Sequence, residues 1–271
     1  MEIKYRKFAP TGNLTLIVET PISRSEQPAV AGKLMAQDKS AEQVGFVEEP
    51  HYLGAALKLQ MMGGEFCGNA TISAAALAMS AREPAVGDKD DIWLEISGAA
   101  EPLCVSIEYK GDDTYSGTVA MPLPESNFDC ELVYESKSIV LPVVRMPGIA
   151  HVIATGGLSP DLAQKAIAQW CRQLDTDALG IMFYDAENKL LNPLVYVAST
   201  DSTMWESSCA SGSCAVAAFE SFRSGKSVSL ELRQPGGTIV ADSFCKAGAL
   251  FGLRLNASVK LRGEFSAEID T

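Results

Sequence analysis

The sequence predicts an α+β fold made of two similar halves. Residues 65–77 and 206–219 share one pattern: an acidic residue, a cysteine, a small polar turn and a run of small apolar residues. Neither apolar run has a polar face, which predicts two helices buried on all sides. Segments of alternating apolar and polar residues surround both helices and predict strands. The order recurs after about 140 residues, which indicates an internal duplication.

Apolar alternation and helical spacing define the elements around the first cysteine segment. Residues 5–18 alternate around Gly12-Asn13, which predicts two strands joined by a tight turn. Residues 27–35 have the spacing of a helix. Residues 53–62 form a strand-like run that ends at Gly63-Gly64, just before the cysteine segment. The other predicted strands of this half are residues 43–47, 92–96, 103–109 and 117–121.

The second half repeats this order after a predicted linker. Pro122 and Pro124, followed by polar residues 125–129, predict the linker. A helix is expected over residues 162–174, with Ser159-Pro160 as its start signal. Each cysteine helix precedes a strand of similar character, which supports duplication over a chance likeness of two alanine-rich helices. The predicted strands are residues 138–144, 150–155, 180–185, 194–197, 228–232 and 237–241.

Composition limits the class of protein. The chain has 271 residues, of which 47% are hydrophobic and 21% charged, as in soluble globular proteins. It has no run of about 20 apolar residues, so we expect no membrane span. No signal-peptide apolar region follows the first residues, so we expect a cytoplasmic protein. A net charge of −12 would repel a phosphate backbone, so nucleic acid is not expected as a partner.

The cysteines predict thiol chemistry rather than disulfides. Seven cysteines occur without a CxxC pair, and only two histidines accompany them, so we expect a reducing compartment and no metal site. Cys67 and Cys209 stand at helix starts, where unpaired N–H groups and the helix dipole favour a thiolate. Such a pair suits an acid and a base on opposite faces of one carbon. The alternative for both is simple packing, which is also the prediction for Cys104, Cys130, Cys171, Cys214 and Cys245.

At these residues the chain resembles the diaminopimelate epimerase superfamily, the cofactor-independent two-cysteine racemases and epimerases. Within it, the chain is most similar to the histidine racemases of opine-metallophore pathways. The resemblance implies two pseudo-symmetric lobes, residues 1–122 with 257–271 and residues 123–256, with residues 258–265 completing the first. It further implies that each lobe is an antiparallel barrel-like sheet around a buried helix, with the active site between lobes. The matching stretches are residues 5–15, 42–46, 64–71, 205–212 and 234–237.

The sequence differs from that of diaminopimelate epimerase itself in the segments with which that enzyme binds the distal end of its substrate. That enzyme carries an Arg in a Glu-Arg-Gly segment before its second cysteine, whereas residues 204–208 here are Met-Trp-Glu-Ser-Ser. Its Asn-Pro-His segment is replaced by Gly148-Ile-Ala-His151. We therefore expect histidine as the substrate. The alternatives are a racemase of another amino acid, diaminopimelate included, and a non-catalytic protein whose thiols serve as redox or metal ligands.

The expected mechanism uses Cys67 and Cys209 in turn as thiolate base and thiol acid, with no cofactor and no metal. Their sulfurs would lie roughly 6–7 Å apart across the α-carbon, and activity would show a bell-shaped pH profile. Backbone amides at the two helix starts would hold the carboxylate. Glu42 would meet the imidazole N–H, or else be an exposed strand-end carboxylate. The amides are those of Gly68, Asn69, Ala210, Ser211 and Gly212, and the ammonium acceptors are Asn13, Gln43 and Glu206.

Three other side chains are candidates for the substrate pocket. Tyr52, His151 and Trp205 could border the side chain of the substrate, but packing is the simpler prediction for each. His151 in particular lies on an apolar predicted strand, where a hydrogen-bonded core histidine is expected. A small-molecule amino acid is the expected partner, and a homodimer is compatible with the sequence.

Overall fold

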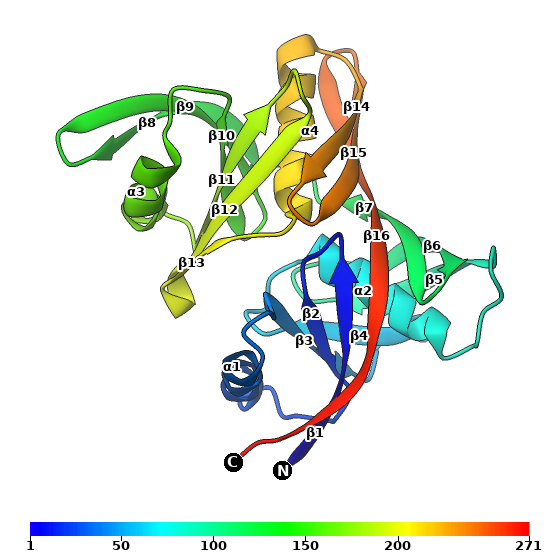
Figure 1. Cartoon of the computed structure of the whole chain (residues 1–271). Coiled ribbons are helices and arrows are strands. Elements are labelled where there is room, and N and C mark those ends of the chain that lie inside the picture. The colour runs from blue at the N-terminus through cyan, green and yellow to red at the C-terminus, as the bar shows by residue number, and fades with distance from the viewer. Residues whose placement is uncertain (271) are drawn as a thin grey trace. The chain divides into compact units, whose positions relative to one another are not determined.

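The computed structural model describes residues 1–270, with the backbone alone described at Thr200. Contacts divide the chain into two units (Figure 1). Unit 1 is Met1–Ala120 together with the chain from Asn256 onward, and unit 2 is Met121–Leu255. Within the described residues the fold is a sheet-dominated α+β fold with four α-helices. The mixed class agrees with the prediction from the sequence.

Unit 1 is a ring of strands. The strands pair in the order β1-β2-β3-β4-β5-β6-β7-β16, and β1 also pairs with β16, so the order closes on itself. In the antiparallel β1–β16 pair, Tyr5 lies opposite Phe265 (Figure 1, dark blue and red). This pairing confirms the expected return of residues 258–265 to the first half. The strands are β1 Glu2–Pro10, β2 Thr15–Val18, β3 Gln43–Glu48, β4 Leu57–Met61, β5 Lys89–Ile96, β6 Leu103–Gly111, β7 Thr114–Met121 and β16 Ala249–Glu268.

Unit 2 follows a similar path, which continues from the first residues of β16. The strands pair in the order β16-β15-β14-β12-β11-β10-β9-β8, and the short β13 pairs with β12. The strands are β8 Ser126–Tyr134, β9 Lys137–Met146, β10 Ile149–Ala154, β11 Ala178–Asp185, β12 Leu190–Val197, β13 Ser202–Trp205, β14 Val228–Gln234 and β15 Gly237–Lys246.

The sheets are mixed, so the expectation of purely antiparallel lobes was wrong. Four neighbouring pairs are parallel: β2–β3, β4–β5, β10–β11 and β12–β14. Each pair is bridged by one helix, and a helical crossover returns the chain to the same edge, which makes the two strands parallel. The crossovers are α1 Gln27–Gln37, α2 Gly68–Ser80, α3 Pro160–Gln173 and α4 Ala210–Ser224; the 3₁₀ turn η1 Ala198–Thr200 precedes β13.

The two cysteine helices form the centres of the two cores. Every residue of α2 from Gly68 to Leu77 is buried, and the helix packs against β1, β2, β4, β5 and β6. Helix α4 is buried from Gly212 to Phe219 and packs against β9, β10, β11, β14 and β15. The prediction of buried helices from their small apolar residues is therefore confirmed. Small side chains let the surrounding strands approach, as at Gly117, where a Cβ would lie 2.4 Å from Ile72 Cγ2.

Three local predictions from the sequence were wrong in detail. The predicted linker continues into strand β8, because Ser126–Tyr134 pairs with β9 over its whole length in spite of its polar residues. Residues 53–56 precede strand β4 as a turn, and the Leu53 side chain is fully exposed. The strand β13 was not predicted, because its four residues are all exposed and carry no alternation. The Ser159 cap was correct: its Oγ accepts from Leu162 N at 3.3 Å.

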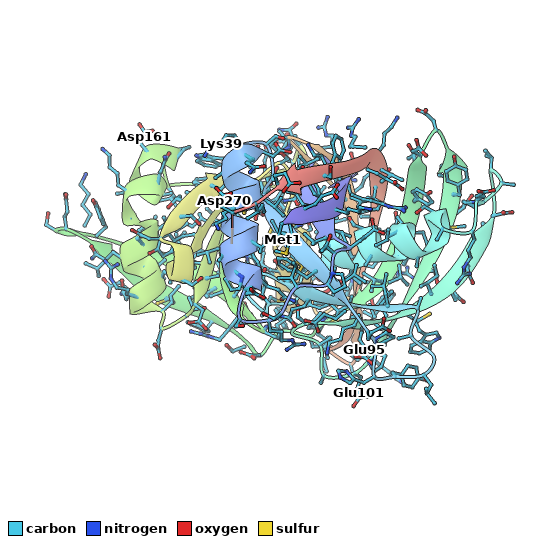
Figure 2. All side chains as sticks on the ribbon, turned by 90° about the horizontal axis from the view of Figure 1, so that it is seen from below. Met1, Lys39, Glu95, Glu101, Asp161 and Asp270 are labelled. Carbon is cyan, nitrogen blue, oxygen red and sulfur yellow. The ribbon has the colours of Figure 1, made fainter. Side chains whose placement is uncertain are left out.

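Both ends of the described chain lie in unit 1, close together (Figures 1 and 2). The Met1 ammonium donates to the Ile269 carbonyl at 2.8 Å, and Lys33 of α1 hydrogen-bonds the carbonyl of Asp270. Ile269 is 2% exposed and joins a core cluster with Ile3 and Leu34. Ile269, near the end of the described chain, is therefore part of the core of unit 1.

Candidate active site

Cys67 is the N-cap of α2. Its backbone is extended (φ −131°, ψ 111°), and its sulfur accepts a hydrogen bond from Ala70 N at 3.4 Å. The chain before it is held by a close backbone approach: a Cβ at Gly98, where φ is +74°, would lie 2.4 Å from Phe66 N. Ser97 Oγ also donates to the Glu65 carbonyl at 2.8 Å. The sulfur is thus placed at the positive end of a buried helix, as the sequence predicts.

A polar network joins Cys67 to three of the predicted substrate-binding side chains in unit 1. The Cys67 thiol donates to Gln43 Oε1 at 3.0 Å. The Gln43 amide donates to Asn13 Oδ1 at 2.8 Å and to Thr15 Oγ1 at 2.7 Å. Asn13 Nδ2 in turn donates to Glu42 Oε2 at 2.7 Å. These bonds orient the Gln43 carbonyl toward sulfur and connect it to the Glu42 carboxylate.

Cys209 occupies the equivalent position in unit 2. It is the N-cap of α4 with an extended backbone (φ −124°, ψ 112°), and its sulfur accepts from Gly212 N at 3.4 Å. Ser211 Oγ lies 3.6 Å from the same sulfur. Cys209 is 6% exposed, so the sulfur meets the backbone N–H and the hydroxyl in a nearly water-free environment.

Two buried side chains fix the backbone of Cys209. Cys209 N donates to Gln234 Oε1 at 2.8 Å, and Gln234 Nε2 donates to Ser213 Oγ at 2.9 Å. Ser213 Oγ closes this clamp by donating to the Cys209 carbonyl at 2.6 Å. Gln234 lies in the segment Gln234-Pro-Gly-Gly237, which carries part of the family resemblance, yet the sequence does not reveal this contact.

The surroundings of Cys209 oppose its ionisation. Burial raises the pKa of the thiol well above its usual value, and the negative charge of Glu206 raises it further. The Ser211 hydroxyl and the Gly212 N–H act in the other direction, because both can donate to a thiolate. Glu206 is therefore close enough to Cys209 to favour the protonated thiol, although the sequence suggests for it only an ammonium contact.

His151 is completely buried in unit 2 beside Cys209. Its Nε2 lies 3.1 Å from Ser211 Oγ, so Ser211 stands between the imidazole and the sulfur. Burial lowers the pKa of His151 to about 3, so the imidazole is neutral at physiological pH. The expectation of a hydrogen-bonded core histidine is half correct, because Nδ1 is buried without a hydrogen-bond partner.

The remaining predicted residues are distributed as follows. Gly68, Asn69 and Ala210 are buried in the first turns of their helices, Asn69 with only 2% exposure. Trp205 is 42% exposed, packs at a tilt against Phe183 with ring centroids 5.6 Å apart, and donates to Gln164. Tyr52 is about half exposed and packs beside Trp93.

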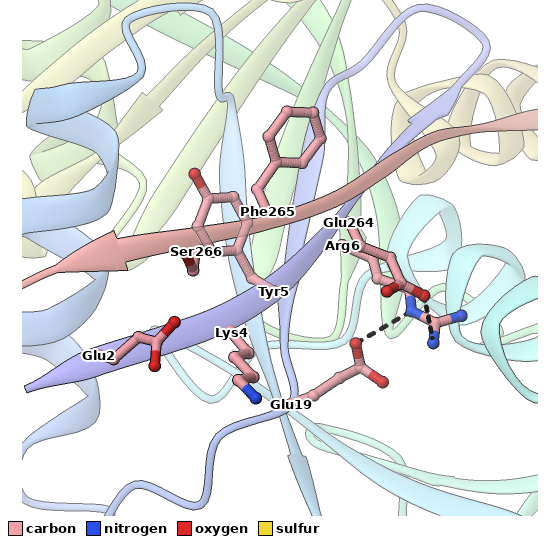
Figure 3. Close-up of a pocket in the computed structure, with 8 residues that line it drawn as sticks. All are labelled: Glu2, Lys4, Tyr5, Arg6, Glu19, Glu264, Phe265 and Ser266. Carbon is pink, nitrogen blue, oxygen red and sulfur yellow. Dashed lines mark hydrogen bonds and ion pairs between the residues drawn. The ribbon is translucent and has the colours of Figure 1, made fainter.

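Two cavities, one in each unit, lie apart from these side chains. In unit 1 a cavity of about 510 Å³ lies over β1 and β16 (Figure 3). Arg6 stands in it between Glu19 and Glu264, with N···O distances of 3.0 and 2.8 Å. In unit 2 a hollow of about 350 Å³ is lined by Phe128, Phe219 and Phe222 among others. None of their lining residues belongs to the predicted site.

Within residues 1–270, no group of three or more His, Cys, Asp and Glu side chains is placed to hold a metal ion. No helix in the described part of the chain combines the length and the apolar character needed to cross a membrane.

Comparisons with known proteins identify the family. Residues 2–267 match the family model described as the histidine racemase CntK N-terminal domain. A histidine racemase of Fusobacterium nucleatum is 32% identical over 225 residues, which cover 79% of this chain and 80% of that protein. A histidine racemase of Staphylococcus aureus is 28% identical over 250 residues, covering 89% and 88%.

Among solved structures, a hydroxyproline epimerase from Agrobacterium vitis has the same fold. Its TM-score is 0.69 at 9% identity, and the match covers 100% of this chain and 93% of that one. The family model spans nearly the whole chain, and a relative exceeds 30% identity over most of its length. This chain therefore belongs to the histidine racemase CntK family.

Proposed function

We propose that the protein interconverts L- and D-histidine by a two-cysteine proton transfer at the α-carbon, without pyridoxal phosphate or a metal. The observation that carries the proposal is the repeated thiol at the start of a buried helix, Cys67 in unit 1 and Cys209 in unit 2. Relatives named histidine racemases support the substrate. Isomerase chemistry is the activity that the family supports.

In the proposed reaction one cysteine enters as thiolate and the other as thiol. The thiolate removes the α-proton from one face, and the thiol gives its proton to the opposite face, so the carbon is inverted and the thiol and thiolate exchange places. The reverse reaction uses the opposite assignment. This geometry requires the two sulfurs to stand roughly 6–7 Å apart across one α-carbon. Exclusion of water would strengthen every hydrogen bond to the developing carbanion.

We assign the substrate carboxylate to the backbone amides of the first helical turns. Ala70 N and Gly212 N donate to the sulfurs. The amides that we assign to the carboxylate are those of Gly68, Asn69, Ala210 and Ser211. Gly212 thus changes from a predicted carboxylate contact to a contact of Cys209 itself. This new assignment of Gly212 has a physical reason, because a thiolate and a carboxylate compete for the same N–H donors at a helix N-terminus.

The side chains that we assign to the cationic groups of histidine are carboxylates and amides. Glu206 would accept from the ammonium, where a bound cation would also offset its effect on Cys209. Glu42 would meet the imidazole. Asn13 Oδ1 already accepts from Gln43, so Asn13 is proposed to orient Glu42 and Gln43 rather than to bind the ammonium alone.

The proposal includes the internal duplication. In each unit an antiparallel pair, β1–β2 or β9–β10, is followed by alternating parallel and antiparallel pairs across two helices. This agreement supports two pseudo-symmetric lobes, residues 1–122 with 257–271 and residues 123–256, each with its sheet around one cysteine helix. The two thiols must stay reduced to function, which is why we place the enzyme in the reducing cytoplasm. A homodimer remains a prediction, and light scattering of the purified protein would test it.

Incubation of the protein with L-histidine in D₂O tests the function. We expect inversion at the α-carbon with deuterium incorporation, insensitive to chelators and to carbonyl reagents that inactivate pyridoxal phosphate. Cys67→Ser and Cys209→Ser are each expected to reduce inversion by at least about a thousandfold with unchanged far-UV circular dichroism. Cys104→Ser is the matched control because Cys104 lies half-buried on β6. Full activity in either serine variant, or inversion only of another amino acid, would contradict the proposal.

A further inference from the structure

The Cys209 sulfur is connected to a buried imidazole through one hydroxyl. The distances are 3.6 Å from Cys209 Sγ to Ser211 Oγ and 3.1 Å from Ser211 Oγ to His151 Nε2. All three residues belong to unit 2, on β10 and at the start of α4. The proposed two-cysteine reaction does not itself need His151, so the buried imidazole requires its own explanation.

The structure makes room for this imidazole at a particular place. A Cβ at Gly180 on β11 would lie 2.4 Å from His151 Nδ1, so only glycine at this position leaves space for the ring. A Cβ at Gly212 would lie 2.1 Å from Met182 Sδ and 3.2 Å from Cys209 Sγ. Because both positions are glycines, β10, β11 and α4 can bring the His151 imidazole, the Ser211 hydroxyl and the Cys209 sulfur close together.

The surroundings of the imidazole select one tautomer. Nδ1 is buried without a partner, so a proton there would be an unsatisfied buried donor, which is the costlier arrangement. The proton therefore belongs on Nε2, which donates to Ser211 Oγ. With its oxygen accepting from Nε2, Ser211 directs its own hydrogen toward the Cys209 sulfur, where it stabilises a thiolate.

We propose that His151 is a positioning residue that holds the Ser211 hydroxyl as a hydrogen-bond donor to the Cys209 sulfur. The proposal deepens the proposed racemase function and rests on it for the catalytic role of Cys209. In this arrangement the proton on Nε2 of the neutral imidazole prevents the Ser211 hydroxyl from donating to His151. In that excluded orientation the serine oxygen would accept a hydrogen bond from the Cys209 thiol and stabilise the protonated sulfur. His151 and Ser211 thereby counteract part of the cost of placing a thiolate in a buried site.

The other groups around this chain of hydrogen bonds do not reproduce its effect. β11 presents Gly180 and Met182 to the imidazole and the helix start, and neither titrates. β14 presents Gln234, which bonds to the Cys209 backbone. Glu206 is the charged group that acts on Cys209, and it favours the protonated thiol. Gly212 N is the other donor to the sulfur, so losing Ser211 would leave a single donor.

The tautomer is measurable in the wild-type protein. The chain has two histidines, His51 and His151, so long-range ¹H–¹⁵N spectra of ¹⁵N-histidine-labelled protein contain two ring systems, and His51→Gln assigns them. We expect His151 to be neutral and protonated at Nε2 throughout pH 6 to 9. A proton on Nδ1, a tautomer mixture or a charged ring would overturn the proposal. This measurement is independent of enzyme activity.

Alkylation of Cys209 measures the effect on the thiolate. We expect Ser211→Ala and His151→Leu to slow iodoacetamide alkylation of the Cys209 peptide at pH 8 by about tenfold, the effect of a pKa rise of one unit. Removal of a side chain alone would open the site and speed the reaction, so a slower reaction is diagnostic. His151→Gln should restore the rate, since its amide N–H can reach Ser211. Cys67 in the same samples is the internal control and should be unchanged.

Catalysis separates a positioning role from a purely structural one. In His151→Leu we expect kcat/KM for histidine to fall about tenfold at neutral pH and to recover as pH rises and the thiolate forms. Ser213→Ala, which breaks the clamp on the Cys209 carbonyl but leaves the hydroxyl of Ser211, should lower stability without slowing Cys209 alkylation. Unchanged alkylation in Ser211→Ala and His151→Leu would reject the inference. A protein that shows the tautomer and alkylation results but does not racemise histidine would reject the function alone.

Discussion

Cys67 and Cys209 each occupy a position where proteins usually place Ser, Thr, Asp or Asn. A helix N-cap needs a side-chain acceptor for an unpaired N–H, and here sulfur accepts from Ala70 N and Gly212 N at 3.4 Å. The same N–H groups stabilise a thiolate. One atom in each unit therefore meets the local requirement of helix capping and would also serve the proposed acid/base chemistry.

The residue scale also shows how the two thiols differ. The Cys67 thiol donates to the neutral carbonyl of Gln43, whereas Cys209 is influenced by the negative charge of Glu206. Two cysteines with the same helical position thus have different polar neighbours. The difference suits a reaction in which one sulfur starts protonated and the other does not.

Replacement of Glu206 by glutamine is expected to make Cys209 more acidic. The Glu206 charge raises the pKa of Cys209, so Glu206→Gln lowers that pKa and increases the thiolate fraction below it. Iodoacetamide alkylation of Cys209 at pH 8 should become faster, even though ammonium binding and kcat/KM suffer. The control is Glu220→Gln on α4, whose carboxylate pairs with Arg223. An equal rate in both variants would argue against the assigned role of the charge.

His151 makes stability depend on pH. Burial lowers its pKa from 6.5 to about 3. Below pH 6.5 the His151 imidazole therefore binds a proton in the unfolded chain but not in the folded chain. The contribution of His151 to the free energy of unfolding is therefore fully present above pH 6.5 and is lost as pH falls toward 3. Between about pH 7.5 and about pH 5 the loss is about 2 kcal/mol.

Urea unfolding at several pH values checks this linkage. His151→Gln carries no titrating ring, so its free energy of unfolding should fall less steeply with decreasing pH than that of the wild type. His51→Gln is the control because it removes the exposed histidine and keeps His151. Parallel pH dependence in wild type and His151→Gln would show that His151 is protonated in the fold.

At the scale of elements, glycines on or next to the surrounding strands allow the close approaches beside each cysteine helix. Gly98 follows β5 and touches the backbone of Phe66, directly before Cys67. Gly180 on β11 makes room for His151. Residues outside the site thus determine where the helix starts lie, because a buried helix moves as a whole when the strand around it moves.

Gly98→Ala is expected to harm both stability and activity. Its φ is +74°, and a Cβ there would lie 2.4 Å from Phe66 N, so Phe66 and Cys67 must shift. Gly87→Ala is the matched control, since Gly87 has φ +94° and nothing within 4 Å. The control should cost about 1–2 kcal/mol from backbone strain alone and keep kcat. Gly98→Ala should cost more in urea unfolding and also lower kcat; equal costs and full kcat would contradict the positioning role.

At the scale of the whole molecule, the two ends of the chain build one unit. The last part of β16 pairs with β1 from Glu2↔Glu268 to Pro10↔Val259, which closes the strand order of unit 1. Tyr5 and Phe265 stack across this pair at 5.9 Å. Long-range pairing of this kind couples the folding of the N-terminal half to completion of the chain.

Deletion of residues 256–271 is therefore expected to unfold unit 1 selectively. The truncated chain leaves the edge of β1 open and removes Ile269 and its neighbours from the core. Hydrogen exchange should show amides of β1 and β2 unprotected, while β10, β11 and β12 keep their protection. The full-length chain under the same conditions is the reference. Equal protection of β1 in both chains would show that β16 is dispensable for unit 1.

Local patterns allowed part of this structure to be predicted. The apolar runs after Cys67 and Cys209, and the Ser159-Pro160 start of α3, are local signals, because helix capping and burial depend on residues a few positions apart. The strand β8 was missed since its polar residues resemble a linker, and pairing with β9 is what makes it a strand. The four parallel pairs were likewise missed, because strand direction depends on crossovers between distant residues.

By itself the sequence determined the two thiols at helix starts, the buried character of their helices, the α+β class and the family. Each of these follows from neighbouring residues or from motifs that can be compared directly. Only the tertiary structure decided that Gln43 faces Cys67, that Glu206 acts on Cys209, and that His151 meets Ser211 with one nitrogen unpaired. Those contacts join residues on separate elements, and their energies depend on burial, which no local stretch of sequence specifies.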